Sequence, residues 1–201
     1  VFKWVASGEG LEKVDRVSEH VLASVCFMLC LSGMMAPIIP YFLPKEYASV
    51  QYLVVACMIV PLFYMVSEAT SIGIGISRKS SYTLLASCMA AAINILGNYL
   101  LVPIYGAAGA AVSTALALWV FMVCRTEMSC LVWRKIPRVK LYATTFVCLS
   151  CAILSSLLGE KGGYKLVMGW FFLFISGFVV FNGSVAAVKR LVIVEYLSWR
   201  R

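Results

Sequence analysis

The stretch NILGNYLLVPIYGAAGAAVST, residues 94–114, decides the fold of this chain. Asn94 and Asn98 lie four residues apart in its apolar first half, so both amides share one face of a predicted helix. In lipid a side-chain amide needs a hydrogen-bond partner. We therefore expect this face to meet protein or a water-filled cavity rather than acyl chains.

A turn and a second helix follow at once. Pro103 is predicted to end the first helix, because proline has no N–H to donate and restricts the residue before it. Gly106 and Gly109 permit a tight turn and close backbone approach. Small residues four apart, such as Gly109 and Ser113, favour close contact between helices in lipid. We expect a tight antiparallel pair of helices.

This pattern resembles the C-terminal signature of the polysaccharide flippases, the Wzx-type exporters of the multidrug/oligosaccharidyl-lipid/polysaccharide (MOP) superfamily. The resemblance extends over roughly residues 22–124 and is strongest in the central stretch. The residues that carry it are Asn94, Asn98, Pro103, Tyr105, Gly106, Gly109, Ala110, Ala111 and Thr114.

The composition defines the broad class of the protein. Of 201 residues, 62% are hydrophobic and only 13% are charged, with a mean hydropathy of +0.93. A soluble domain of this length needs far less apolar surface, so we expect an all-α integral membrane protein. The net charge of +8 is then expected to record membrane topology rather than contact with nucleic acid.

Six apolar segments are each long enough to cross a bilayer core of about 30 Å. An amphipathic entry segment, residues 1–20, precedes them, with Leu11, Val14, Val17 and Val21 at helical spacing. Four core spans are predicted within residues 21–124, a basic loop at 125–140, two accessory spans within 141–188 and a basic tail at 189–201. The six spans are residues 21–43, 47–76, 82–102, 107–124, 141–158 and 166–188.

The distribution of Lys and Arg supports this count. With six spans, fourteen of the seventeen cations fall on one side and three on the other. This split fits the positive-inside rule with both ends of the segment cytoplasmic. The three on the opposite side are Lys45, Lys161 and Lys165.

Glu68 is the only acidic residue within a predicted span. A carboxylate in hydrocarbon costs roughly 2.5–3.5 kcal/mol on insertion scales, so it usually faces a cavity or a partner. Pro61, Tyr64, Ser71 and Gly75 recur with it at steps of three and four residues and form one polar stripe. We expect Glu68 to line a transport cavity and bind a coupling proton, a cation or a sugar. The alternative is a carboxylate satisfied by hydroxyls near the end of the span.

The two asparagines also have two interpretations. An amide both donates and accepts hydrogen bonds, which suits sugar hydroxyls. It suits bonds between helices equally well, and these contribute about 0.6–2 kcal/mol each. We favour the structural role for Asn94 and Asn98 and keep them as candidate cavity residues.

The residue inventory disfavours enzymes, metal sites and cofactors. Asp15 is the only aspartate and His20 the only histidine, so a paired-aspartate or multi-histidine metal site is excluded for this chain. The eight cysteines lie in or beside apolar stretches, and we expect Cys26, Cys30, Cys148 and Cys151 to pack between helices. We expect a protein that is not an enzyme and needs no cofactor.

The resemblance implies a function. In such flippases two six-helix bundles rock about a central cavity and move a polyprenyl-pyrophosphate-linked oligosaccharide across the cytoplasmic membrane of a bacterium or archaeon. This chain would be the C-terminal half and would need an N-terminal half or a second chain; its first residue, Val1, fits such a fragment. Family cavities are cationic, whereas no Lys or Arg lies within a predicted span here. The alternatives are a multidrug or toxin exporter of the same superfamily and a non-transporting membrane scaffold.

Overall fold

The computed structural model describes residues 11–184 and 186, and within these the secondary structure is helical, with no strand. The all-α fold predicted from the sequence is confirmed for this part of the chain. The helices, in chain order, are α2 (Leu11–Met35), η1 (Ala36–Tyr41), η2 (Lys45–Tyr47), α3 (Val50–Thr70), α4 (Ile72–Ile76), α5 (Ser81–Tyr105), α6 (Ala107–Val132), α7 (Val139–Gly162) and α8 (Tyr164–Val180).

Five of these helices are long and apolar enough to cross a membrane. They are α3, α5, α6, α7 and the N-terminal helix α2 with its η1 extension. The sixth predicted span corresponds to α8, which is apolar but has 17 residues and a length of about 26 Å. Of the remaining positions of that predicted span, residues 185 and 187–188 lie outside the described residues.

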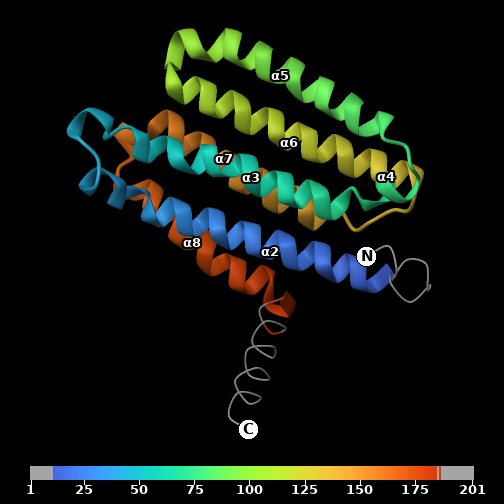
Figure 1. The fold of residues 1–201 in the computed structure, drawn as a ribbon. Helices are drawn as coiled ribbons and strands as arrows, with labels where there is room; N and C mark the ends of the chain where they lie inside the picture. The colour runs from blue at the N-terminus through green and yellow to red at the C-terminus, as the bar shows by residue number, and fades with distance from the viewer. Residues whose placement is uncertain (1–10, 185, 187–201) are drawn as a thin grey trace.

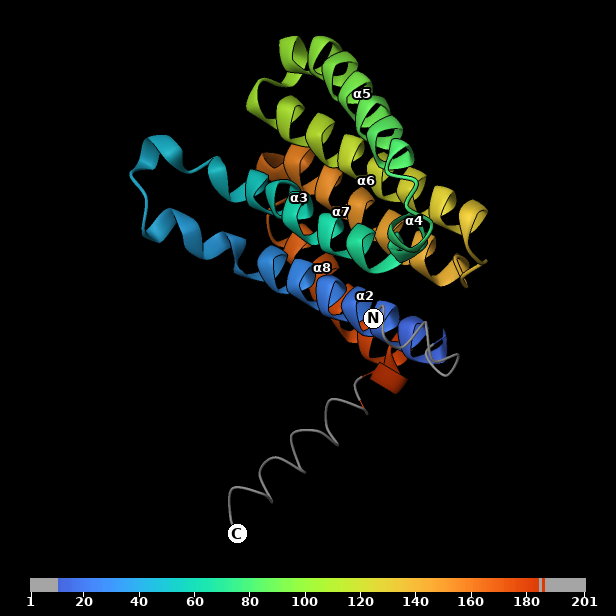
Figure 2. The same cartoon turned by 45° about the vertical axis from the view of Figure 1, so that its right-hand side comes forward.

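The long helices run antiparallel in one bundle (Figure 1). α5 lies at one edge and packs on α6; α3 and α7 lie between α6 and α2, and α8 lies at the opposite edge (Figures 1 and 2). The amino-terminal end of α2 and the α4–α5 and α6–α7 connections gather at one end of the bundle. We call this the α4–α5 end. The α5–α6 and α7–α8 turns lie at the other end.

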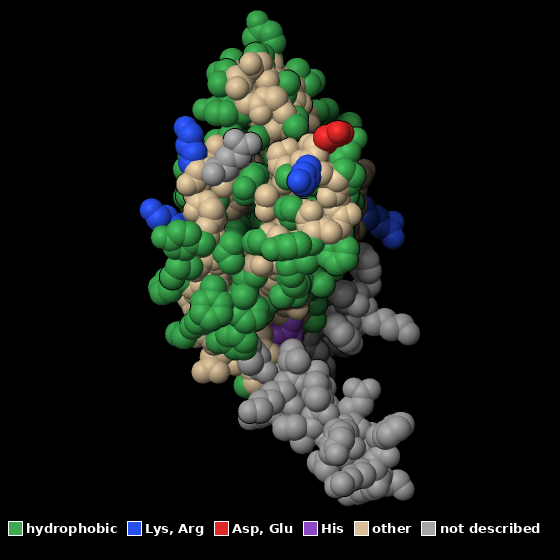
Figure 3. All heavy atoms as spheres, turned by 90° about the vertical axis from the view of Figure 1, so that its left-hand side faces the viewer, with side chains coloured by type: hydrophobic (Ala, Val, Ile, Leu, Met, Phe, Trp, Pro, Cys, Tyr) green, Lys and Arg blue, Asp and Glu red, His purple; other side chains and the backbone are tan. Residues whose placement is uncertain are grey.

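The two ends of the bundle differ in their charged side chains. The α4–α5 end carries Arg78, Lys79 and the cations of the α6–α7 connection. The face at the opposite end is covered mainly by hydrophobic and uncharged side chains, with few charged ones (Figure 3). The described part therefore has the alternation of connections that the sequence predicts, and its cytoplasmic orientation stays a prediction.

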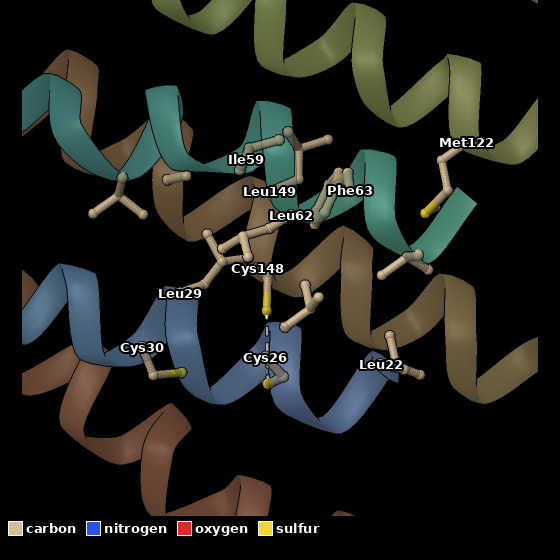
Figure 4. Packing of buried hydrophobic residues seen from close by; sticks show 14 of the residues in the cluster. Leu22, Cys26, Leu29, Cys30, Ile59, Leu62, Phe63, Met122, Cys148 and Leu149 are labelled. Carbon is tan, nitrogen blue, oxygen red and sulfur yellow. Dashed lines mark hydrogen bonds between the residues drawn. The ribbon is translucent and has the colours of Figure 1, made fainter. Parts of the chain in front are cut away.

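The core lies where α2, α3, α6 and α7 meet. Leu29, Ile59, Phe63, Met122 and Leu149 are fully buried and point toward one another (Figure 4). The side of α3 that carries Ile59 and Phe63 thus packs against helices, opposite the side that carries the exposed Glu68. Because lipid tails are as apolar as these side chains, they stabilise the bundle through close van der Waals packing between helices rather than through removal from water.

Cysteines add to this core. Cys26, Cys30 and Cys148 are buried free thiols, and the Sγ atoms of Cys26 on α2 and Cys148 on α7 are 3.9 Å apart (Figure 4). At this distance the two sulfur atoms are in contact. Their placement agrees with the predicted packing between helices.

The α5–α6 pair has the predicted close antiparallel contact. Gly109 lies against the backbone of Leu101, and Gly97 lies against the side chain of Ser113, so a methyl group at either glycine would clash. The prediction that Pro103 ends the first helix is wrong: α5 continues to Tyr105. Gly106 ends it, because its φ of +56° belongs to a region that glycine adopts without strain.

Three further boundaries differ from the sequence predictions. α2 begins at Leu11, so the described part of the entry segment is continuous with the first span. α3 contains Pro61 and continues to Thr70, and Ser71 separates it from the short helix α4. α6 extends two turns beyond the predicted end at residue 124, to Val132.

Candidate functional site

A polar hollow of about 690 Å³ lies at the α4–α5 end, between the end of α3, α4, the start of α5 and α6. We call it the polar cavity. Polar side chains supply much of its wall. The residues that line it are Glu68, Ser71, Ile72, Ile74, Gly75, Arg78, Ser80, Thr83 and Arg125.

The central feature of this cavity is an ion pair between α3 and α6. Arg125 Nη1 donates to Glu68 Oε1 at 2.6 Å and to Ser67 Oγ at 3.1 Å. The Arg125 side chain is 8% exposed, whereas that of Glu68 is 50% exposed. The guanidinium is therefore enclosed by protein, and the carboxylate remains open to the cavity.

This pair corrects two expectations. We expected no cation within a span, yet Arg125 lies inside α6, one of the five candidate membrane-spanning helices. Glu68 was also expected to be the only acidic residue in a span, but Glu127 lies in α6, and Asp15 and Glu19 lie in the candidate span that begins at Val14. The physical reason is that α6 continues past residue 124, because its polar side chains find partners on α3 and α4.

These partners form a polar seam between the two segments. Thr70 and Thr126 join their hydroxyls at 2.7 Å, and the Gly73 N–H donates to Ser129 Oγ at 3.0 Å. The Ser77 hydroxyl donates to the carbonyl of Val132. Buried polar groups are costly unless they are hydrogen-bonded. The seam therefore fixes the register of α6 against α3 and α4 and holds Arg125 in place.

The other members of the predicted stripe have different environments. Tyr64 is exposed and stacks on Phe121 of α6, with ring centroids 6.1 Å apart, and it does not line the polar cavity. Ser71 lines the cavity, and its backbone carbonyl accepts from the N–H of Ile74. Arg125 also lies over the ring of Phe121.

Asn94 and Asn98 lie elsewhere. Asn98 Nδ2 donates to Asn94 Oδ1, and the hydroxyl of Ser113 on α6 contacts both the carbonyl and Oδ1 of Asn94. Ser113 is twelve residues before Arg125 on α6, about 18 Å along the helix axis. The structure therefore joins the asparagines to the α5–α6 pair and does not bring them to Glu68.

Two remaining members of the signature act within the α5–α6 pair. Thr114 Oγ1 donates to the carbonyl of Ala110 one turn earlier on the same helix. Tyr105, the last residue of α5, is exposed. Neither residue lines the polar cavity.

A second group of ion pairs, beside the polar cavity, was not predicted. Asp15 on α2 makes a two-point contact with Arg134, with oxygen–nitrogen distances of 2.6 and 3.0 Å. Lys140 pairs with Glu19 on α2, and Glu127 pairs with Arg138 and accepts from the hydroxyl of Tyr142. These contacts attach the α6–α7 connection to α2 and α6, and they attach α7 to the same two helices.

A sequence signal for Arg125 did exist. Small polar residues recur at helical spacing on both partners: Ser67, Thr70 and Ser77 are three and seven residues apart, and Thr126 and Ser129 are three apart. This spacing is typical of two faces that hydrogen-bond to each other. The hydrophobic pattern alone predicts that the span ends before Arg125, the first charged residue after the apolar run.

The helices and the polar cavity define the class of this protein as a multi-pass α-helical membrane protein with a charged pair between two helices. No protein-family model, curated protein or solved structure matches the chain, so the comparisons do not define the class more narrowly. Its particular function has to be argued from the site.

Proposed function

We propose that this chain is the C-terminal part of a transporter that flips a lipid-linked oligosaccharide, a polysaccharide or O-antigen repeat unit on polyprenyl pyrophosphate, across the cytoplasmic membrane. Two bundles would rock about a central cavity to which this chain contributes one wall. The observation that carries the proposal is the Glu68–Arg125 pair beside a hollow of about 690 Å³. The resemblance of residues 94–114 to the flippase signature supports the same class.

The charge of the polar cavity favours an anionic substrate. Arg78 and Arg125 line it together with a single carboxylate, that of Glu68, so its formal charge is +1. Arginine recognises phosphate through parallel N–H donors, and these bonds are strong in a partly buried site. A pyrophosphate-linked head group fits this charge, whereas an exporter of cationic toxins needs an excess of acidic groups.

The wall also offers groups suited to sugars. Ser71, Ser80 and Thr83 line the polar cavity, and each hydroxyl both donates and accepts hydrogen bonds. The helix is interrupted at Ser71, between α3 and α4. Interrupted helices in membrane transporters are tolerated where they line a cavity, and they are common at substrate sites.

The proposal is tested in cells that lack the gene encoding this chain. We expect lipid-linked glycan to accumulate on the inner leaflet, and the wild-type gene to remove it. Arg125→Gln should restore little transport, whereas Lys140→Gln, which removes a cation of a more exposed ion pair at the same end, should restore it fully.

Three outcomes would contradict the proposal. Normal transport by a well-expressed Arg125→Gln variant would exclude the polar cavity as the path. Loss of cationic dye efflux without glycan accumulation would favour a multidrug exporter. A scaffold would be favoured by two results together: Arg125→Gln relieves the glycan accumulation, and deletion of the whole chain destabilises other membrane proteins.

A further inference from the structure

We propose that Glu68 is an internal counter-ion of Arg125. It pairs with Arg125 when the polar cavity is empty and separates from Arg125 when an anionic group enters the cavity. This inference rests on the proposed function, because it describes how the same cavity regulates access of its substrate. The anionic group is of the phosphate or pyrophosphate class. The exchange would keep a buried arginine paired in both states.

The two partners of the ion pair are buried to unequal degrees. Arg125 is more than nine-tenths buried, so it cannot gain water as compensation if its partner is lost. A buried charge without a partner is strongly destabilising. Glu68 is half exposed to the polar cavity and can be hydrated there after it separates. Glu68 is therefore the partner that can move, and Arg125 the one that needs replacement.

The hydrogen-bonding capacity of Arg125 is incompletely used by the described residues. Nη1 makes both contacts, to Glu68 and Ser67, while Nε is buried and has no partner among the described residues. A single carboxylate oxygen at Nη1 leaves part of the planar donor set unused. A phosphate group has more acceptor oxygens than this contact uses, and it can accept two parallel bonds from one guanidinium.

A second arginine also lines the polar cavity. Arg78 lines the same hollow from the α4–α5 connection, and within the described residues it has no ion pair. Its φ is +51°, in the left-handed region that non-glycine residues rarely occupy. Strained residues of this kind persist where the surrounding structure holds them and are common at ligand sites. An anion between Arg78 and Arg125 would contact both, and the N-terminus of α5 beside it favours negative charge.

This exchange of partners at Arg125 predicts a result that simple electrostatic attraction between the cavity and an anion does not. If Glu68 competes with the ligand for Arg125, then removal of the Glu68 charge must strengthen anion binding. Had Glu68 been part of the binding surface, its removal would weaken binding. Glu127 offers a matched control, because it carries the same charge on α6, two residues from Arg125, and is paired with Arg138 and Tyr142 instead.

The experiment is titration calorimetry of the purified chain in detergent with inorganic pyrophosphate. Glu68→Gln should bind at least about tenfold more tightly than wild type, and Arg125→Gln at least about tenfold more weakly, each equal to about 1.4 kcal/mol. Glu127→Gln should stay within about twofold of wild type. Glu68→Asn provides a second neutral variant if Glu68→Gln does not fold.

The outcomes separate this inference from the proposed function. Unchanged or weaker binding by both neutral Glu68 variants would overturn the counter-ion exchange and leave transport untouched. Full binding by Arg125→Gln, or no binding by any variant, would overturn it as well. Stronger binding by Glu68→Gln in a protein whose gene deletion causes no glycan accumulation would support the exchange and refute the flippase.

Discussion

Removal of either member of the Glu68–Arg125 pair should have unequal effects on stability, and the structure gives the direction. Glu68→Ala leaves Arg125, with its 8% exposed side chain, without its carboxylate. Removing one partner of a fully buried pair costs about 3–5 kcal/mol. Because Glu68 is half exposed and Ser67 still accepts a bond from Arg125, we expect about 2 kcal/mol.

Arg125→Met should cost less. It removes the buried charge together with its contact over the ring of Phe121, keeps an apolar side chain of similar length, and leaves a Glu68 carboxylate that the polar cavity can hydrate. A neutral side chain of similar volume often replaces a buried charge at little cost. We expect a loss below about 1 kcal/mol for this variant.

The assay is thermal unfolding of the purified chain in detergent, followed by tryptophan fluorescence. At about 2–4 °C per kcal/mol for a chain of this size, Glu68→Ala should lower the midpoint by about 4–8 °C. Arg125→Met should lower it by less than about 4 °C. An Arg125→Met midpoint at or below that of Glu68→Ala would refute the argument from unequal burial.

Three further predictions test the fold. Gly109→Ala should lower the free energy of unfolding by about 1–3 kcal/mol, because the methyl group meets the backbone of α5, whereas Gly169→Ala, which meets no atom within 4 Å, should be near neutral in the same unfolding assay. Mild oxidation should join Cys26 to Cys148, whose sulfur atoms are 3.9 Å apart, and peptide mass spectrometry without that cross-link would contradict the contact between α2 and α7. Asn94→Ala should cost about 1 kcal/mol of stability and leave pyrophosphate binding unchanged in the calorimeter; weaker binding would assign Asn94 to the substrate path.

Part of this structure could be predicted from local sequence patterns. The α5–α6 hairpin follows from small residues at helical spacing and from glycines in the turn, which act within a few residues of one another. Gly109 and Ser113 are examples, since both lie in the predicted close contact. The alternation of membrane passes follows in the same way from apolar length and the positions of Lys and Arg.

The site required information from distant parts of the chain. Arg125 follows an apolar run, and a charge there ordinarily marks the end of a span. It stays within the helix because Ser67 and Glu68, more than fifty residues earlier, supply its partners. The pairing of Asp15 with Arg134 likewise joins residues 119 positions apart. The spacing of small polar residues indicates a polar face on each helix, but it does not specify which residues of two distant segments pair.

Pro103 illustrates a different limit. Proline removes only the bond of its own N–H, and the residues after it keep their donors: the Gly106 N–H still donates to the carbonyl of Val102. The helix therefore continues to Tyr105 and ends where Gly106 adopts a positive φ. Conformational preference of the glycine, rather than the missing donor, sets the boundary.

The most direct test of the central claim is cysteine labelling at Thr83, which lines the polar cavity at the start of α5. In a variant whose native cysteines are replaced by alanine, Thr83→Cys is exposed to a membrane-impermeant maleimide in oriented vesicles. The account predicts labelling from the side opposite to a cysteine at Lys45, and protection by the lipid-linked oligosaccharide. Labelling from the same side as position 45, or labelling that the substrate does not slow, would contradict it.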